Sequence, residues 1–161
     1  MTRNSVLLAQ KLGDLLLHKA WQVTCAESCT GGGIGYAITS ISGSSSWFKQ
    51  GYITYSNDAK HQLLGVHPDT LQNFGAVSAQ TVEEMAAGAA KNASAQCAIA
   101  VSGIAGPDGG SAEKPVGTVW FGFAIEQKVK AERQYFLGDR QQVRDQAIDF
   151  GLLRMYELLD E

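Results

Sequence analysis

"WQVTCAESCTGGGIGYAITSI", residues 21–41, is the stretch of sequence that decides the fold. Its first part, residues 21–26, is a short apolar run of the kind that forms a buried strand. In residues 30–41 we expect a helix, with the hydroxyl of Thr30 able to cap its first turn. The junction holds a carboxylate, two hydroxyls and a thiol, followed by three glycines at positions 31–33. A strand that passes into a helix in this way predicts an α/β protein, in which ligands bind beyond the carboxyl ends of the strands.

The rest of the chain alternates helices with strands and ends in a hairpin and a helix. Leucines at helical spacing predict a first helix over residues 4–19, and a stripe of small side chains predicts another from Ser78. Asp139 begins the final helix, with Gln142 three residues later completing a capping box. We also expect strands at 48–56 and 96–103, a short helix at 57–65, and a hairpin of 116–125 with an edge strand at 130–136. This order predicts one domain over residues 1–161, a sandwich on a mixed, mostly parallel sheet.

The composition excludes several classes of protein. A formal net charge of −3 argues against a nucleic-acid binder, and no apolar run reaches the ~18 residues that a membrane span needs. The three cysteines are an odd number without a CxxC pair, which favours reduced thiols in a cytoplasmic protein. The three histidines form no cluster with cysteines at ligand spacing, so we expect no metal site.

Ser28 is the first candidate for chemistry. A hydroxyl at a strand-to-helix turn lies where unpaired N–H groups of the helix can hold a phosphate or an oxyanion. Ser28 is therefore a possible nucleophile, although Ser28 and Thr30 could equally cap the helix while the glycines serve packing. The loop is neither a Walker loop nor a dinucleotide fingerprint nor a GxSxG elbow, because the sequence lacks the residues that these motifs require.

A nucleophilic serine needs a base, and Lys60 is the candidate of most interest. It follows a second strand that could lie beside the first, on a short helix near the same edge of the sheet. A lysine acts as a base when burial lowers its pKa from ~10.4 towards ~7–8, although most lysines are solvated surface charges. A Ser-His-Asp triad is possible but has no support in the sequence, and Cys29 is a rival nucleophile beside a helix N-terminus.

Two arginines and a long loop are candidates for binding an anion. Arg140 and Arg144 lie four residues apart near the start of the last helix, where the helix dipole disfavours cations. Neighbouring aspartates, Asp139 and Asp145, could neutralise them, or the guanidinium groups could bind a phosphate. The glycine-rich loop 102–115, "SGIAGPDGGSAEKP", could be a plain connection or could offer N–H groups to an anion or a carboxamide.

Four stretches together resemble the CinA C-terminal family: "AESCTGG" at 26–32, "GSSSWFKQGYITYSNDAK" at 43–60, "SGIAGPDGGSAEKPVGTVWF" at 102–121 and "GDRQQVRDQA" at 138–147. The resemblance extends over the whole chain and implies a three-layer α/β/α sandwich that forms a homodimer. It implies an enzyme that hydrolyses nicotinamide mononucleotide to nicotinate mononucleotide and ammonia, recycling a pyridine nucleotide without metal or cofactor. The N-terminal domain of longer CinA proteins is expected to be missing. One departure is Ser102-Gly103, where many relatives have Thr-Gly.

By the same resemblance, the family's catalytic serine falls on Ser28, its lysine on Lys60 and its motif arginine on Arg144. Ser28 would attack the carboxamide after Lys60 removes its proton. The expected binding residues include the N–H groups around the first loop, the two arginines, the start of the long loop and an aromatic side chain for the ring: Thr30, Gly31, Gly32, Arg140, Arg144, Ser102, Gly103 and Tyr55. Two alternatives remain, a catalytically silent module that binds a pyridine nucleotide and a serine or cysteine esterase. Neither a nucleic acid nor a membrane is expected as a partner.

Overall fold

The computed structural model describes residues 1–161, and strand β1 (Val23–Glu27) is buried along its whole length. On one side β1 pairs in parallel with β2 (Tyr52–Ile53), and on the other side with β3 (Cys97–Gly103). A strand that is covered on both faces is a continuous apolar run rather than an alternating one, which is the pattern of residues 21–26. The predicted strand at the start of the deciding stretch is therefore confirmed.

The hairpin of β4 (Thr118–Ile125) and β5 (Lys128–Tyr135) completes a sheet of five strands in the order β2-β1-β3-β4-β5. Only β4 runs against the other strands, since it is antiparallel to both β3 and β5. β5 alternates exposed and half-buried side chains and forms one edge of the sheet, as its sequence predicts. The sheet is thus mixed and mostly parallel.

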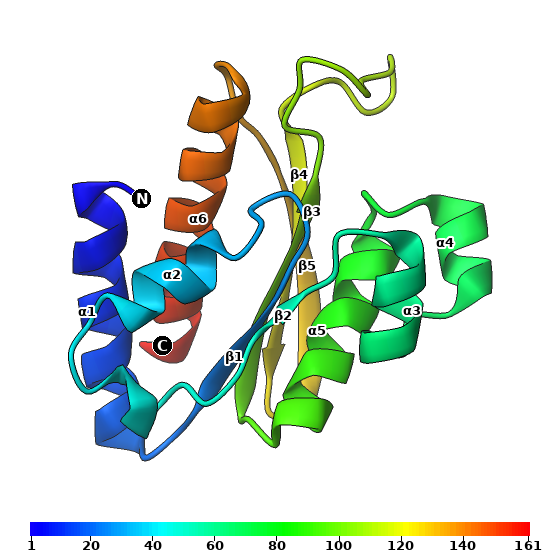
Figure 1. Ribbon diagram of the computed structural model, residues 1–161. Coiled ribbons are helices and arrows are strands. Elements are labelled where there is room, and N and C mark those ends of the chain that lie inside the picture. The colour runs from blue at the N-terminus through cyan, green and yellow to red at the C-terminus, as the bar shows by residue number, and fades with distance from the viewer.

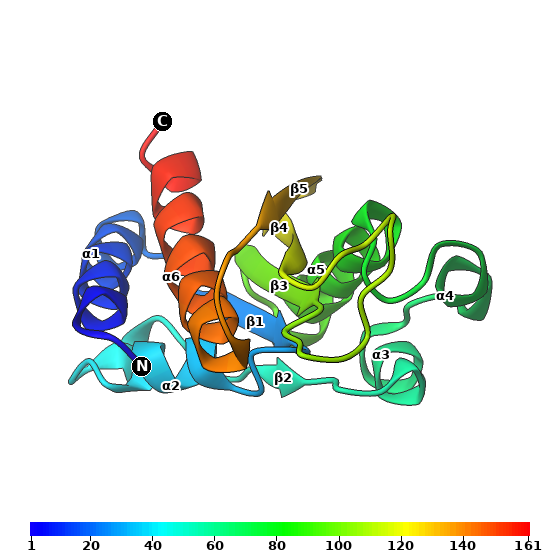
Figure 2. The same ribbon diagram turned by 90° about the horizontal axis from the view of Figure 1, so that it is seen from above.

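Helices cover both faces of the sheet and make three layers (Figures 1 and 2). One face is covered by α1 (Arg3–Lys19), α2 (Gly33–Thr39) and α6 (Arg140–Leu159), and the other by α3 (Asn57–Leu64), α4 (Pro68–Phe74) and α5 (Ala79–Ala93). A short 3₁₀ helix, η1 (Ser44–Ser46), follows α2. The larger core, which includes Leu12, Ile99 and Phe121, lies on the α6 side, and a smaller one around Met85 lies under α5. The predicted α/β/α sandwich is confirmed, and none of the helices is long and apolar enough to span a membrane.

The capping box at the start of the last helix is confirmed. The Asp139 side chain accepts the N–H of Gln142, and the Gln142 side chain accepts the N–H of Asp139. Ser78 likewise caps α5, and Gly65 ends α3 in the left-handed conformation. Local sequence chemistry thus fixes these boundaries.

Three expectations differ from the structure. The strand predicted at 48–56 is only two residues long. The hydroxyl of Thr24 donates to the carbonyl of Gln50, which is therefore not part of a strand ladder, and Phe48 pairs with β1 only through an isolated bridge to Val23. Helix α4 was not predicted, since it has no buried residue and hence no apolar stripe. Thr30 does not cap α2, whose N-cap is Gly32.

Close contact between α5 and α3 depends on a glycine in the small-residue stripe. A Cβ at Gly88 would lie 1.9 Å from the carbonyl oxygen of Leu64, which is backbone and cannot move aside freely. The helix can therefore approach α3 only because residue 88 has no side chain.

We expect Gly88→Ala to destabilise the protein by about 1–3 kcal/mol, as overpacking in a tight site does, although alanine is the better helix former. Urea denaturation measures the free energy of unfolding. Ala87→Gly, at the exposed neighbouring position, is the control and should cost only about 0.5–1 kcal/mol. A Gly88→Ala protein that is more stable than the parent would contradict this account.

Candidate active site

Three strand ends meet at one edge of the sheet and bring the predicted residues together. Ser28 directly follows β1, Thr54 and Tyr55 follow β2, and Ser102 lies at the end of β3. A cavity of about 280 Å³ opens there. It is lined by Ser28, Cys29, Tyr55, Asn57, Lys60, Ala76, Val77, Ser102, Gly103, Ala105 and Arg140. The position is the one that open α/β sheets use for ligands.

Lys60 and Ser28 are in direct contact in this cavity. The Nζ atom of Lys60 lies 3.1 Å from the Oγ atom of Ser28 and donates to the carbonyl oxygen of Thr54 at 2.9 Å. Lys60 is 1% exposed and Ser28 8% exposed, so the contact is nearly free of bulk water. Ser56 caps α3, and Lys60 projects from the first turn of that helix back over β1.

Burial lowers the pKa of Lys60 below its usual value of 10.5, and only the nearby Cys29 acts in the opposite direction. No carboxylate lies within 4.0 Å of the ammonium group, and its polar neighbours are a hydroxyl and a carbonyl. An unpaired, desolvated lysine is the arrangement that favours a neutral amine. Geometry and electrostatics together therefore permit Lys60 to accept a proton from Ser28.

The buried carboxylate of Glu27 organises the loop that follows β1. Its Oε1 atom accepts the hydroxyl of Thr30 at 2.5 Å and the N–H of Ile34 at 2.9 Å, and its Oε2 atom accepts the N–H of Gly35 at 3.0 Å. Glu27 is 1% exposed. No pattern in the sequence predicts this role for Glu27, because a cap that acts from seven and eight residues upstream lies outside the local capping patterns.

This cap changes the expectation that the first turn of α2 binds an anion. The N–H groups of Ile34 and Gly35 point at Glu27, while Gly33 donates to Thr30 and Tyr36 donates to Gly32. All four N–H groups of the first turn of α2 are therefore occupied. The expectation that this turn binds an anion is wrong.

The turn before α2 still offers backbone donors. The N–H of Gly31 donates to the carbonyl of Ser28 at 3.0 Å, but the N–H groups of Thr30 and Gly32 donate to no protein acceptor. Gly31 and Gly32 have φ values of +58° and +99°, which strain other residues, and a Cβ at Gly33 would lie 2.3 Å from Ile148. The glycines thus shape a turn in which two backbone N–H groups have no protein acceptor.

The two arginines of α6 act on different parts of the site. Arg140 lines the cavity and donates to the carbonyl of Gly106 at 2.8 Å and to the hydroxyl of Tyr55 at 3.3 Å. Arg144 donates to the carbonyl of Cys29 at 3.1 Å and lies 3.5 Å from that of Thr30.

The possible neutralisation of these arginines by Asp139 and Asp145 does not occur. Asp139 caps the helix, and Asp145 contacts the chain's amino terminus and Gln141. Neither arginine has a carboxylate within 4.0 Å. Both guanidinium groups are held by neutral acceptors.

Comparison with known proteins places this site in a family. The sequence model of the CinA C-terminal domain matches residues 6–159. The chain belongs to the CinA C-terminal domain family.

Individual relatives agree with this assignment. The chain is 60% identical over 146 residues to the nicotinamide-nucleotide amidohydrolase PncC of Enterobacter agglomerans, covering 90% of this chain and 89% of that protein. It is 51% identical over 151 residues to the protein of the same name from Escherichia coli strain K12, covering 93% and 92%. The crystal structure of the competence/damage inducible protein CihA from Agrobacterium tumefaciens superposes with a TM-score of 0.95 at 40% identity, covering 100% of this chain and 98% of that one.

In this CinA-family chain three further predicted residues line the cavity: Tyr55, which is 64% exposed, and Ser102 and Gly103 at the end of β3. Thr30, Gly31, Gly32 and Arg144 were also predicted as binding residues but are not among its lining residues. Asn57, Ala76, Val77 and Ala105 line it as well and were not predicted. Asn57 and Ala105 carried a signal, because they lie in two of the stretches that resemble the family, "SNDAK" and "SGIAGPDGG", whereas Ala76 and Val77 lie in none.

Cys29 lines the cavity but is poorly suited to be the nucleophile. Burial raises the pKa of its thiol to about 11, so little thiolate forms near neutral pH. None of the three histidines lines the cavity. Among the side chains that line this cavity, Ser28 and Lys60 are therefore the two whose contact suits a nucleophile and a base.

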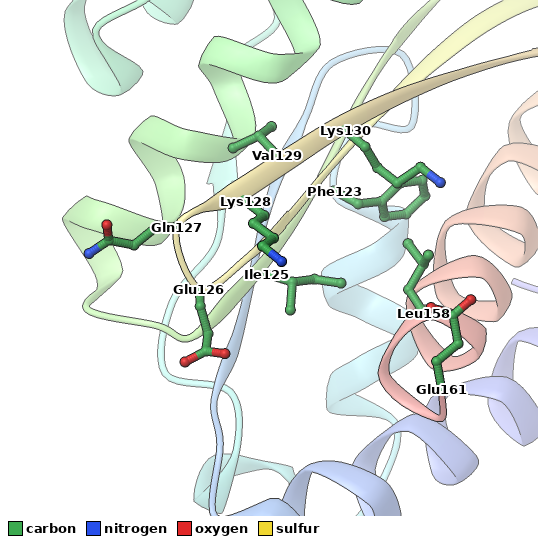
Figure 3. A pocket seen from close by; sticks show the side chains of 9 residues that line it. All are labelled: Phe123, Ile125, Glu126, Gln127, Lys128, Val129, Lys130, Leu158 and Glu161. Carbon is green, nitrogen blue, oxygen red and sulfur yellow. The ribbon is translucent and has the colours of Figure 1, made fainter.

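A larger cavity of about 870 Å³ lies at the opposite end of the sheet, between the β4–β5 hairpin and the end of α6 (Figure 3). Its polar side chains are two lysines, two glutamates and a glutamine, and it contains no serine, threonine, cysteine or histidine. Size alone does not identify the site here, because only the smaller cavity brings reactive groups together.

The lowered pKa of Lys60 has a consequence for stability. Between its folded-state pKa and its usual value of 10.5, the unfolded chain binds more protons, so this residue makes stability rise with pH across that window. Lys60→Met removes the effect. We expect the difference in unfolding free energy, Lys60→Met minus parent, to fall as the pH rises towards 10.5.

Urea denaturation at a series of pH values gives this difference, in which the titration of all other groups cancels. Lys91→Met is the matched control, because Lys91 is exposed and its charge stays in water. A difference for Lys60→Met that stays constant across the whole range would contradict the lowered pKa.

Proposed function

We propose that the chain is a nicotinamide-nucleotide amidohydrolase, which converts nicotinamide mononucleotide and water into nicotinate mononucleotide and ammonia. Relatives that carry this name are 51–60% identical over most of the chain. The observation that carries the proposal is the 3.1 Å contact between Ser28 Oγ and Lys60 Nζ in a buried cavity. That contact joins a hydroxyl and an amine in a cavity that no carboxylate and no histidine lines.

In the first step, neutral Lys60 takes the proton of Ser28 while Oγ attacks the carboxamide carbon. The tetrahedral intermediate carries its negative charge on the former carbonyl oxygen. The N–H groups of Thr30 and Gly32, which lack protein acceptors, are the proposed donors to that oxygen. Gly31 contributes through its left-handed conformation, since its N–H is already bonded to Ser28.

In the second step, the Lys60 ammonium gives its proton to the departing nitrogen. The C–N bond breaks, ammonia leaves, and an acyl ester on Ser28 remains. Lys60 then removes a proton from water as the water oxygen attacks the ester carbon. When the bond to Ser28 Oγ breaks, the Lys60 ammonium returns that proton to Oγ and nicotinate mononucleotide leaves. The pyridinium charge of the substrate favours the neutral form of Lys60 while the substrate is bound.

The rest of the cavity is proposed to hold the nucleotide. Arg140 now donates to a carbonyl and a hydroxyl, and a phosphate would be a stronger acceptor for its planar group. The exposed ring of Tyr55 can stack on the pyridinium, which is a cation–π contact. Ser102 and Gly103 are proposed to contact the ribose and phosphate, with Arg144 supporting the loop beside them.

We further propose that the protein acts in the cytoplasm as a homodimer and recycles pyridine nucleotides. The homodimer and the recycling come from the family resemblance, and the cytoplasm from the odd number of cysteines without a CxxC pair. Light scattering of the purified protein tests the dimer directly.

We expect the purified protein to release ammonia from nicotinamide mononucleotide, and Ser28→Ala to abolish the release. Lys60→Met should reduce the rate by about 10²–10⁴, the usual contribution of a general base. Cys29→Ala should keep most of the activity, and the exposed Lys91→Met is the control for loss of a lysine. A parent protein that binds the nucleotide without releasing ammonia would instead be a silent binding module, and an active Ser28→Ala would exclude Ser28 as nucleophile.

The pH dependence provides a second test. Because the base must be neutral, kcat/KM should rise with pH, and burial of Lys60 should place the midpoint below 10.5. Initial rates of ammonia release at a series of pH values measure the midpoint. It should fall in the same window in which the Lys60→Met stability difference changes, and a profile without a rising limb would contradict the role of Lys60.

A further inference from the structure

The carboxylate of Glu27 is a buried charge that the proposed reaction does not use. It has no Lys, Arg or His within 4.0 Å and does not line the cavity. Its partners are the Thr30 hydroxyl, the N–H groups of Ile34 and Gly35, and, at 3.5 Å, the thiol of Cys25. A carboxylate is costly to bury, and here only hydrogen bonds and the dipole of a short helix compensate.

Glu27 and Arg144 hold the loop between Ser28 and Gly32 from two sides. Inside the fold, Glu27 holds the Thr30 side chain at 2.5 Å. From α6, Arg144 holds the carbonyl of Cys29 at 3.1 Å. The peptide group is planar and trans, so its N–H points opposite to its C=O. Holding the Cys29 carbonyl therefore also sets the direction of the Thr30 N–H.

The geometry points to Glu27 as a positioning residue that fixes the oxyanion donors of the Ser28 loop. This inference rests on the proposed function, because it assigns to Glu27 the placement of donors for that reaction. The carboxylate also accepts the N–H groups of Ile34 and Gly35, so these two donors of α2 are not free to bind a ligand. The oxyanion of the tetrahedral intermediate is therefore left with the donors of the turn before the helix. Glu27 itself transfers no proton.

Glu27→Gln is the sharpest test. Both oxygens of the Glu27 carboxylate accept hydrogen bonds, whereas a glutamine amide has one oxygen that accepts and one NH₂ group that donates. In either orientation the NH₂ group of the substituted side chain would therefore face a donor, either the N–H of Gly35 or the donors of Thr30 and Ile34. We expect kcat to fall about 10²-fold, the scale of a lost or displaced oxyanion donor, with little change in KM. The pH midpoint of kcat/KM should stay at the parent value, since Lys60 remains the base.

Binding of the product, nicotinate mononucleotide, measured by calorimetry, separates positioning from general damage. The Glu27→Gln protein should bind the product about as tightly as the parent does, because the product lacks the oxyanion of the tetrahedral intermediate. Glu161→Gln is the control for the same chemical change at an exposed position. If Glu27→Gln does not fold, Thr30→Val tests the same contact by removing one donor to Oε1, and it should lower kcat in the same direction with KM preserved.

Three outcomes overturn the inference: a folded Glu27→Gln enzyme with the parent kcat, a fall in activity that lies entirely in KM and product affinity, or a displaced pH midpoint. Where Glu27→Gln does not fold, a Thr30→Val enzyme with the parent kcat also overturns it. Ser28→Ala distinguishes these results from failure of the proposed function. If Ser28→Ala keeps the parent rate, the proposed nucleophile is wrong. If it is inactive while Glu27→Gln is fully active, only the role of Glu27 is wrong.

Discussion

The burial of one lysine amine beside a serine hydroxyl is the constraint on which this site depends. Lys60 must reach Ser28 without meeting a carboxylate, because an ion pair would hold the amine in its charged form. The sheet order meets this requirement, since β2 pairs in parallel with β1 and the carbonyl of Thr54, directly after β2, becomes the second partner of the amine. The capped start of α3 then places Lys60 over the end of β1. Strand order and the cap of α3 thus together place the Lys60 amine beside the Ser28 hydroxyl.

A second constraint concerns the distribution of charge around the cavity. The acidic group nearest to Ser28 in sequence, Glu27, turns inwards and accepts hydrogen bonds from Thr30 and from the first turn of α2. The basic groups come from the first turns of α6, where a cation is unfavourable by about 0.3–1 kcal/mol. Carbonyl acceptors in loops 29–30 and 106 offset that cost for Arg144 and Arg140. The result is a cavity lined by two basic side chains, Lys60 and Arg140, and by no carboxylate, which suits a substrate that carries a phosphate.

Much of the fold could be predicted from the sequence because its signals are local. The buried strands are apolar runs, the α6 capping box lies within four residues, and the β5 edge alternates. Features that depend on distant partners could not be predicted. Helix α4 has no apolar face, β2 is shortened by the side chain of Thr24, and the cap of α2 comes from Glu27 rather than Thr30. The candidate residues Ser28 and Lys60 were identified by type and resemblance, but their contact is a property of strand order, which the sequence does not state.

The choice of base follows from the same geometry. A histidine would titrate near neutrality without help, yet none of the three lies at the cavity, and His61, the neighbour of Lys60, is bonded to the carbonyl of Val66. Helical spacing explains this, because adjacent residues on a helix face different directions. Only residue 60 of this helix both lines the cavity and is titratable. A lysine there needs a dry environment to act as a base, and closure of the cavity by Tyr55, Arg140 and the long loop supplies part of it. In the proposed reaction the walls of the cavity therefore support proton transfer as well as substrate binding.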